Sequence, residues 1–120
     1  MRIFIAHASN FDFRGKLYDP IRSSLLNEEH EFILPQEQGT EIITRDVIKE
    51  IDLFVVDASM PSTGAGIELG WASAYGKPII GIHEKGTTPT RALRFVTHIV
   101  LEYSSADDLI EKLGVAIVRA

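Results

Sequence analysis

Short apolar runs alternate with longer segments of helical periodicity along this chain. The runs are rich in β-branched and aromatic residues and end in turn residues or charges, which is typical of strands. Two of them, Leu53–Val56 and Ile79–Ile82, are almost continuously apolar, as expected of strands that helices cover on both faces. The predicted strands are Arg2–Ala8, Glu31–Leu34, Leu53–Asp57, Pro78–His83 and His98–Leu101.

The segments between these runs place apolar residues three or four positions apart, which indicates amphipathic helices. The predicted helices are Lys16–Asn27, Glu41–Ile51, Gly66–Tyr75 and Ala106–Val115, the last opened by a capping Ser104 or Ser105. Strands that alternate with helices predict an α/β fold with a doubly wound, five-stranded parallel sheet. We expect one flavodoxin-like domain over residues 1–120, with strand order 2-1-3-4-5 and three layers, α/β/α.

Composition narrows the classes of partner and compartment. The chain has 120 residues, 12 Lys+Arg and 17 Asp+Glu, and its formal net charge is −5. Without a basic cluster, binding to polymeric nucleic acid or to an anionic membrane is not expected. No stretch approaches the roughly 18 apolar residues of a membrane span. The absence of cysteine excludes disulfides and thiolate metal sites and fits a cytoplasmic location. The four histidines have no metal-ligand spacing, so we expect no metal and no cofactor.

The expected topology also predicts where a ligand binds. In open α/β sheets the ligand lies beyond the carboxyl ends of the strands, where the strand order reverses. Here that point falls between the first and third strands, at loops 8–14 and 58–66. His7 stands at the end of the first strand, where it could meet a ligand or simply be a partly buried histidine.

The loop after the third strand enters a helix through Pro61, a hydroxyl residue and two glycines. Small residues allow close backbone approach, and the free amides of a helix N-terminus favour an anion. We therefore expect a phosphate or sugar at Ser62, Gly64 and Gly66. Glu68 follows just inside the helix, where the dipole would favour an ionised, nucleophilic carboxylate. The alternative is that Glu68 only complements the helix dipole.

Three segments of this region resemble the nucleoside 2-deoxyribosyltransferase superfamily. They are DLFVVD at residues 52–57, PSTGAGIELGWA at residues 61–72 and YGKPII at residues 75–80. The superfamily shares the five-stranded fold and includes base-exchanging transferases and deoxynucleoside 5′-monophosphate N-glycosidases. The resemblance places the nucleophilic glutamate on Glu68. It also favours a monophosphate substrate, because Ser62 stands where the transferases commonly carry Asp.

The resemblance implies further roles around the same pocket. His7, Ser9 and Asn10 would lie in the phosphate-binding loop, and Thr90 would be a polar residue supplied to a neighbouring subunit. Asp46 is the candidate for a second catalytic carboxylate. A departing base needs a proton, which Asp46 or Asp57 could supply. The expected catalytic residues are Glu68 and Asp46, and the expected substrate-binding residues are His7, Ser9, Asn10, Asp57, Ser62, Gly64, Gly66 and Thr90.

The sequence thus predicts an enzyme that cleaves the N-glycosidic bond of a small nucleotide or nucleoside through a glutamate nucleophile, by hydrolysis or by transfer to another base. Two alternatives stay open. The run Ile3–Ser9 and the later glutamate also resemble a TIR domain, which would mean NAD cleavage or an interaction module. A non-catalytic nucleotide sensor is the other, because Phe4 stands where the superfamily has a tyrosine. We also expect a homo-oligomer, since short loops alone leave the pocket open to water.

Overall fold

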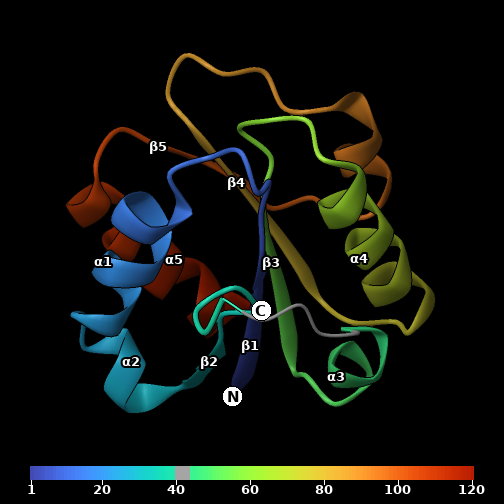
Figure 1. Ribbon diagram of the computed structural model, residues 1–120, viewed down its shortest axis with the longest axis horizontal. Helices are drawn as coiled ribbons and strands as arrows, with labels where there is room; N and C mark the ends of the chain where they lie inside the picture. The colour runs from blue at the N-terminus through green and yellow to red at the C-terminus, as the bar shows by residue number, and fades with distance from the viewer. Residues whose placement is uncertain (40–43) are drawn as a thin grey trace.

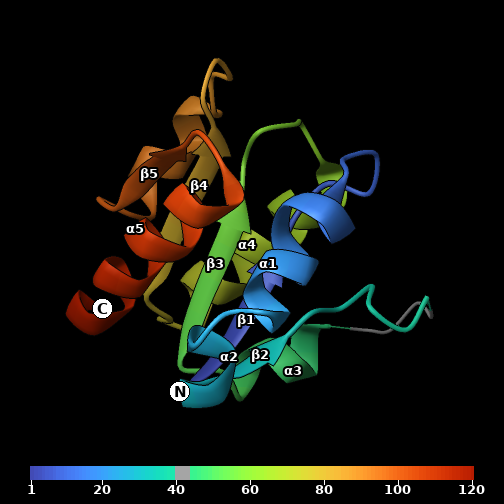
Figure 2. The same cartoon turned by 90° about the vertical axis from the view of Figure 1, so that its left-hand side faces the viewer.

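A parallel sheet forms the middle layer of the protein in a computed structural model that describes residues 1–39 and 44–120 (Figures 1 and 2). Within those residues the sheet has five strands in the order β2-β1-β3-β4-β5, and every pairing is parallel. The strands are β1 (Arg2–Ala6), β2 (Glu31–Ile33), β3 (Leu53–Asp57), β4 (Ile79–Glu84) and β5 (Val100–Tyr103). The predicted doubly wound sheet and its strand order are confirmed.

Helices cover both faces of the sheet (Figure 1). One face carries a π-helical turn, η1 (Arg14–Tyr18), followed by α1 (Asp19–Arg22), α2 (Leu26–Glu29) and α5 (Ala106–Arg119). The other face carries α3 (Arg45–Lys49), α4 (Thr63–Ala74) and a 3-10 helix, η2 (Arg91–Phe95). The chain therefore winds to opposite sides from β1 and from β3, and the sequence order reverses between these two adjacent strands.

Alternate residues of the central strands build two separate cores. Ile3 and Ile5 face the layer with α1 and α5, where Leu17, Ile21 and Leu113 are also fully buried. Phe4 and Ala6 face the layer with α3 and α4. This alternation follows from the two-residue repeat of a strand. Because both faces are apolar, the central strands read as continuously hydrophobic in the sequence.

The predicted helix Lys16–Asn27 is wrong as a single element. The structure divides it into η1, α1 and α2. Pro20 lies in the first turn of α1, and it has no amide hydrogen to continue a hydrogen-bonded helix from the preceding turn. The chain therefore passes through a π-helical turn before the proline, and this turn brings Tyr18 under the loop after β1.

Other predicted elements differ at their ends. β3 has the predicted bounds, whereas β1 ends at Ala6 because its pairing with β3 stops at Val56. β5 begins two residues later than predicted. Of the predicted helix Glu41–Ile51, residues 45–49 form α3 and residues 41–43 lie outside the described residues. In residues 1–39 and 44–120, no helix is both long and apolar enough to cross a membrane.

Candidate active site

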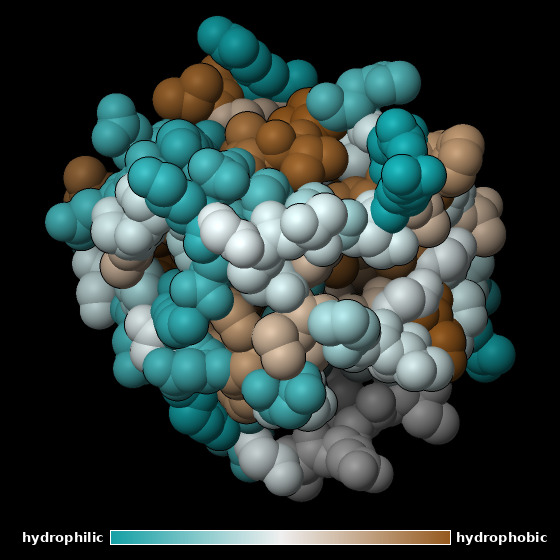
Figure 3. Space-filling view, turned by 90° about the horizontal axis from the view of Figure 1, so that it is seen from above, coloured by the Kyte–Doolittle hydropathy of each residue, from teal (hydrophilic) through white to brown (hydrophobic). Residues whose placement is uncertain are grey.

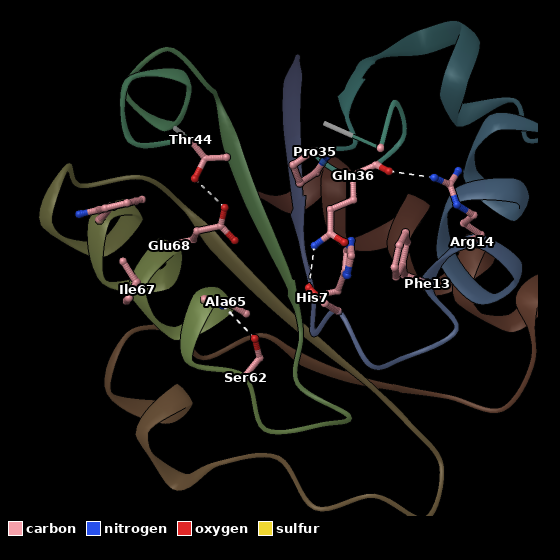
Figure 4. A pocket seen from close by; sticks show the side chains of 14 residues that line it. His7, Phe13, Arg14, Pro35, Gln36, Thr44, Ser62, Ala65, Ile67 and Glu68 are labelled. Atoms are coloured by element: carbon pink, nitrogen blue, oxygen red, sulfur yellow. Dashed lines mark hydrogen bonds between the residues drawn. The ribbon is translucent and has the colours of Figure 1, made fainter. Parts of the chain in front are cut away.

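A cavity of about 530 Å³ lies at the carboxyl ends of β1 and β3 (Figure 4). The loops after β1 and β2 form one wall, and the first three turns of α4 with the start of α3 form the other. This is the position predicted from the strand order. Of the predicted site residues, the cavity is lined by His7, Ser9, Ser62, Gly64 and Glu68.

The N-terminus of α4 faces this cavity through Ser62 and Gly64. Ser62 is the N-cap, and its Oγ accepts a hydrogen bond of 3.1 Å from the amide of Ala65. This cap starts the helix at Thr63, three residues before the predicted start at Gly66. By helix geometry, the amides of Thr63 and Gly64, the first two residues of α4, have no acceptor within the helix and are available to an anion. Gly66 does not line the cavity.

Glu68 is the sixth residue of α4, and its carboxylate points into the cavity (Figure 4). Thr44, at the start of α3, donates a hydrogen bond of 2.7 Å to Glu68 Oε2. Burial raises the pKa of Glu68, and the Thr44 hydrogen bond partly opposes this shift. Burial therefore opposes the ionisation that the helix dipole was expected to favour, because Glu68 lies beyond the first turn and loses water.

His7 is a buried, neutral part of the cavity wall. Burial lowers its pKa, and its ring stacks on Phe13 with centroids 4.3 Å apart. Nδ1 lies 2.9 Å from the carbonyl oxygen of Ala8, which can only accept, so Nδ1 carries the proton. Nε2 therefore accepts from the Tyr18 hydroxyl at 2.6 Å. Both ring nitrogens are occupied, so His7 shapes the loop rather than offering a free acid or base.

Hydrogen bonds between the loops after β1 and β2 stabilise the wall opposite Glu68 (Figure 4). Gln36 Nε2 donates to Ser9 Oγ at 3.1 Å, and the Gln36 amide donates to the Tyr18 hydroxyl at 3.1 Å. Arg14 donates to the carbonyl oxygens of Gln36 and Glu37 at 3.0 and 3.3 Å. The loops after β1 and β2 are thereby held together across the sheet edge.

Sequence reasoning missed several residues of this cavity. Among the described lining residues, Arg14 is the one with a cationic side chain. Gln36 adds a side-chain amide beside Ser9. Trp71 of α4 also lines the cavity. Arg14 could have been predicted, because it ends the loop 8–14 that was expected to meet the ligand. Gln36 follows β2, whose end was not expected to reach the site.

Asp57 is placed away from the cavity. It is buried at the end of β3, where its carboxylate accepts hydrogen bonds from the Tyr103 hydroxyl at 2.5 Å and the Ser59 amide at 2.8 Å. Burial raises its pKa. Asp57 therefore connects β3, β5 and the loop before α4, and its expected contact with substrate is not supported.

Three further expected residues also lie outside the cavity lining: Asp46, Thr90 and Asn10. The Asp46 side chain is 73% exposed on α3, with Arg45 Nε 3.7 Å from its Oδ1. Thr90 is exposed and caps η2, accepting a hydrogen bond of 3.4 Å from the Ala92 amide. Asn10 is exposed. Among the described lining residues, Glu68 is thus the one carboxylate. The fold does not place Asp46 beside it.

Phe4 cannot orient the carboxylate. It is fully buried between β1 and the layer with α4, and it stacks on Phe54 with centroids 5.6 Å apart. Within the described part of the chain, no group of three or more His, Asp or Glu side chains could hold a metal ion.

Comparison with known proteins supplies relatives of this arrangement. No protein-family model matches the chain. A protein of Thermofilum pendens, whose name describes a 2′-deoxynucleoside 5′-phosphate N-hydrolase, is 31% identical over an alignment of 91 residues. The match covers 68% of this chain and 64% of that protein. The chain therefore matches less than two thirds of that relative's length.

Solved structures match over nearly the whole chain. The CMP N-glycosidase BcmB of Clostridium botulinum superposes with a TM-score of 0.69 and 28% identity, covering 95% of this chain and 99% of the other. A pilus assembly-related protein of Burkholderia pseudomallei has a TM-score of 0.53 and 13% identity over 100% of this chain and 91% of its own, so it shows only the shared fold.

Proposed function

The chain belongs to the nucleoside 2-deoxyribosyltransferase-like superfamily, and from this premise we propose that it is an N-glycosidase that hydrolyses a nucleoside 5′-monophosphate to a free base and a sugar 5-phosphate. The relatives named above support this class of reaction, since one is named for a deoxynucleoside 5′-phosphate and the other for CMP. Ser62, which can donate to a phosphate where a carboxylate would repel it, supports the monophosphate.

One observation carries the proposal: a single helix presents an anion-binding end and a carboxylate to the same cavity. Ser62 and Gly64 stand at the N-terminus of α4, and Glu68 follows on the same side. The six residue steps from Ser62 to Glu68 rise about 9 Å along a helix, on the scale of a nucleoside monophosphate. A phosphate bound at the helix end would leave the sugar beside Glu68.

The phosphate would be bound locally, because the chain carries a net charge of −5. The Ser62 Oγ accepts from the Ala65 amide, so its own proton remains available to a phosphate oxygen. The first amides of α4 add donors at the positive end of the helix dipole. Gly64 has no side chain to block approach to them. Arg14 supplies a cation on the opposite wall.

Glu68 would act as the nucleophile in two displacements. Its carboxylate oxygen bonds to C1′ as the bond from C1′ to the base nitrogen breaks, and the electron pair leaves with the base, which takes a proton from water. A water molecule then attacks C1′, the ester bond to Glu68 breaks, and a proton is released to solvent. Both steps pass through an oxocarbenium-like transition state that a carboxylate stabilises. A base in place of that water would give transfer instead of hydrolysis.

The substitution Glu68→Gln tests the proposal. The variant keeps the size of the side chain but removes the nucleophilic charge, so base release from a nucleoside 5′-monophosphate should fall at least about a thousandfold. Free base is measured by chromatography after incubation with each ribo- and deoxyribonucleoside monophosphate. The matched control is Glu111→Gln on the exposed surface of α5, which should release base at the wild-type rate.

Other substrates separate the remaining functions. Base exchange between a nucleoside and an added base would assign a transferase, and nicotinamide release from NAD would assign the TIR-like activity. Binding of a monophosphate without release of base would assign the nucleotide sensor. The placement of Asp46 outside the cavity lining is the observation in favour of that function. If wild type and Glu68→Gln release base equally, the nucleophile is not Glu68.

We also propose that the protein is a homo-oligomer whose interface covers part of the cavity. The face at the carboxyl ends of the strands carries hydrophobic side chains among polar ones (Figure 3). Ile67, in the cavity lining, is 50% exposed, and Met60 on the preceding loop is 38% exposed. Exposed apolar side chains beside a site favour a protein contact. Light scattering at assay concentration should report an oligomer; a fully active monomer would contradict the proposal.

A further inference from the structure

We propose that Thr44 is a positioning residue for Glu68: its hydroxyl group holds the carboxylate in the orientation that faces the substrate. The inference rests on the proposed function of Glu68 and adds a residue that none of the sequence expectations included. Thr44 lies outside α4, at the start of α3, so the contact joins two elements on the same wall of the cavity.

The contact is short and sheltered. Thr44 Oγ1 donates to Glu68 Oε2 at 2.7 Å, and Thr44 is only 8% exposed. Among the residues that the structure describes, no other group donates a hydrogen bond to the Glu68 carboxylate, and no lysine or arginine forms an ion pair with it. Within the described residues, one hydroxyl group therefore sets the orientation of this carboxylate.

The local backbone turns this hydroxyl toward α4. Thr44 is the residue before α3, the position where a threonine usually caps its own helix, yet it makes no side-chain capping bond. Ser62 and Ser105, which do cap their helices, have extended backbones, whereas Thr44 has a helical one with φ −87° and ψ −13°. The hydroxyl of Thr44 therefore bonds the neighbouring helix in place of its own.

Packing between α3 and α4 keeps donor and acceptor together. Ile48 of α3 and Ala72 of α4 are fully buried in the same core. The carbonyl oxygen of Thr44 accepts from the Ile48 amide at 2.9 Å, which ties Thr44 to the packed part of α3. Two rigid elements thus set the distance between Thr44 and Glu68, as positioning requires.

The hydrogen bond has two consequences for a nucleophile. Because it engages Oε2, it leaves Oε1 to approach C1′. It also stabilises the charged carboxylate against the burial that raises the pKa of Glu68. A hydroxyl is not an acid near neutral pH, so Thr44 would act on Glu68 and not on the leaving base.

The pair Thr44→Val and Thr44→Ser tests this role. Valine keeps the shape of threonine without a donor, whereas serine keeps the donor. Thr44→Val should lower kcat roughly 10- to 100-fold, the value of a hydrogen bond to a charged group, with KM changed little. It should also raise the Glu68 pKa and move the acid limb of the kcat profile to higher pH. Thr44→Ser should stay close to wild type in both.

The readouts are steady-state kinetics and carboxyl NMR of ¹³C-labelled glutamate, with circular dichroism to confirm folding. A higher Glu68 pKa and lower kcat in Thr44→Val, both restored in Thr44→Ser, support the proposal. An unchanged kcat or an unchanged Glu68 pKa in folded Thr44→Val overturns it. If Thr44→Val does not fold, Thr44→Ala, which also lacks the donor, takes its place: a lower kcat and a higher Glu68 pKa support the proposal, and a wild-type value of either overturns it. If wild type releases no base, the proposed function fails, and the NMR titration alone still decides whether Thr44 holds the carboxylate.

Discussion

Ser62 combines two roles that can be separated by a charge. Its Oγ caps α4 through the Ala65 amide, and its proton is available to the proposed phosphate. Ser62→Asp should keep the cap, because an aspartate also accepts from the helix amides. The added negative charge should raise KM for the monophosphate at least tenfold, about 1.4 kcal/mol, by repulsion. KM for the corresponding nucleoside should change little, which steady-state kinetics on both substrates can measure.

The control makes the same substitution at another cap. Ser105 caps α5 by accepting from the Asp108 amide at 3.1 Å, away from the cavity. Ser105→Asp should leave both KM values unchanged. Equal KM values for the monophosphate in wild type and Ser62→Asp would show that the phosphate does not lie at this end of α4.

At the scale of single residues, the sequence predicted which loops carry the polar residues of the cavity. It predicted less well which way each side chain points. Ser62, Gly64 and Glu68 were found because a glycine-rich helix start and a carboxylate are visible in a linear pattern. Asp57 has the same chemistry but faces inward to Tyr103, and one position along a strand decides this. Thr44 and Gln36 belong to other segments, and only the tertiary fold brings them to the cavity.

At the scale of elements, strands were predicted well and helix ends were not. The burial of the central strands on both faces makes them continuously apolar, so the parallel sheet could be read directly. Helix ends depend on single caps and breaks. The Ser62 cap starts α4 before its glycines, and Pro20 divides the segment after β1. Propensity disfavours glycine in a helix, and here a capping bond and packing outweigh it.

At the scale of the whole molecule, His7 couples folding to pH. Its pKa is lowered by burial, so the folded protein keeps it neutral while the unfolded chain takes up a proton near pH 6.5. The stability from a neutral His7 is therefore complete above about pH 6.5 and decreases as pH falls below it, by up to about 1.4 kcal/mol per pH unit. The His7 contribution to the free energy of unfolding in urea should accordingly fall from pH 7.5 to pH 5.5, while the raised pKa values of Asp57 and Glu68 act in the opposite direction.

Two variants isolate this contribution from those of Asp57 and Glu68, whose burial-raised pKa values affect all the proteins alike. His7→Gln removes the titrating group and should reduce the loss of stability between the two pH values, whatever its effect at pH 7.5. His98→Gln changes an exposed histidine and should keep the wild-type loss. The same loss in His7→Gln and wild type would mean that other groups carry the pH dependence.

The helix α4 carries both Ser62 and Glu68, and this fixes a length. The stretch from Ser62 to Glu68, about two helical turns, is stiff, so thermal movement of α4 against the sheet displaces both residues together and leaves their spacing unchanged. The helix thus acts as a molecular ruler between the anionic end of a ligand and its reacting carbon. In a ligand with a longer phosphate chain, a terminal phosphate bound at this helix end would hold the reacting carbon one phosphate unit too far from Glu68. Inserting a helical turn would change the spacing between Ser62 and Glu68, whereas substituting a side chain would not.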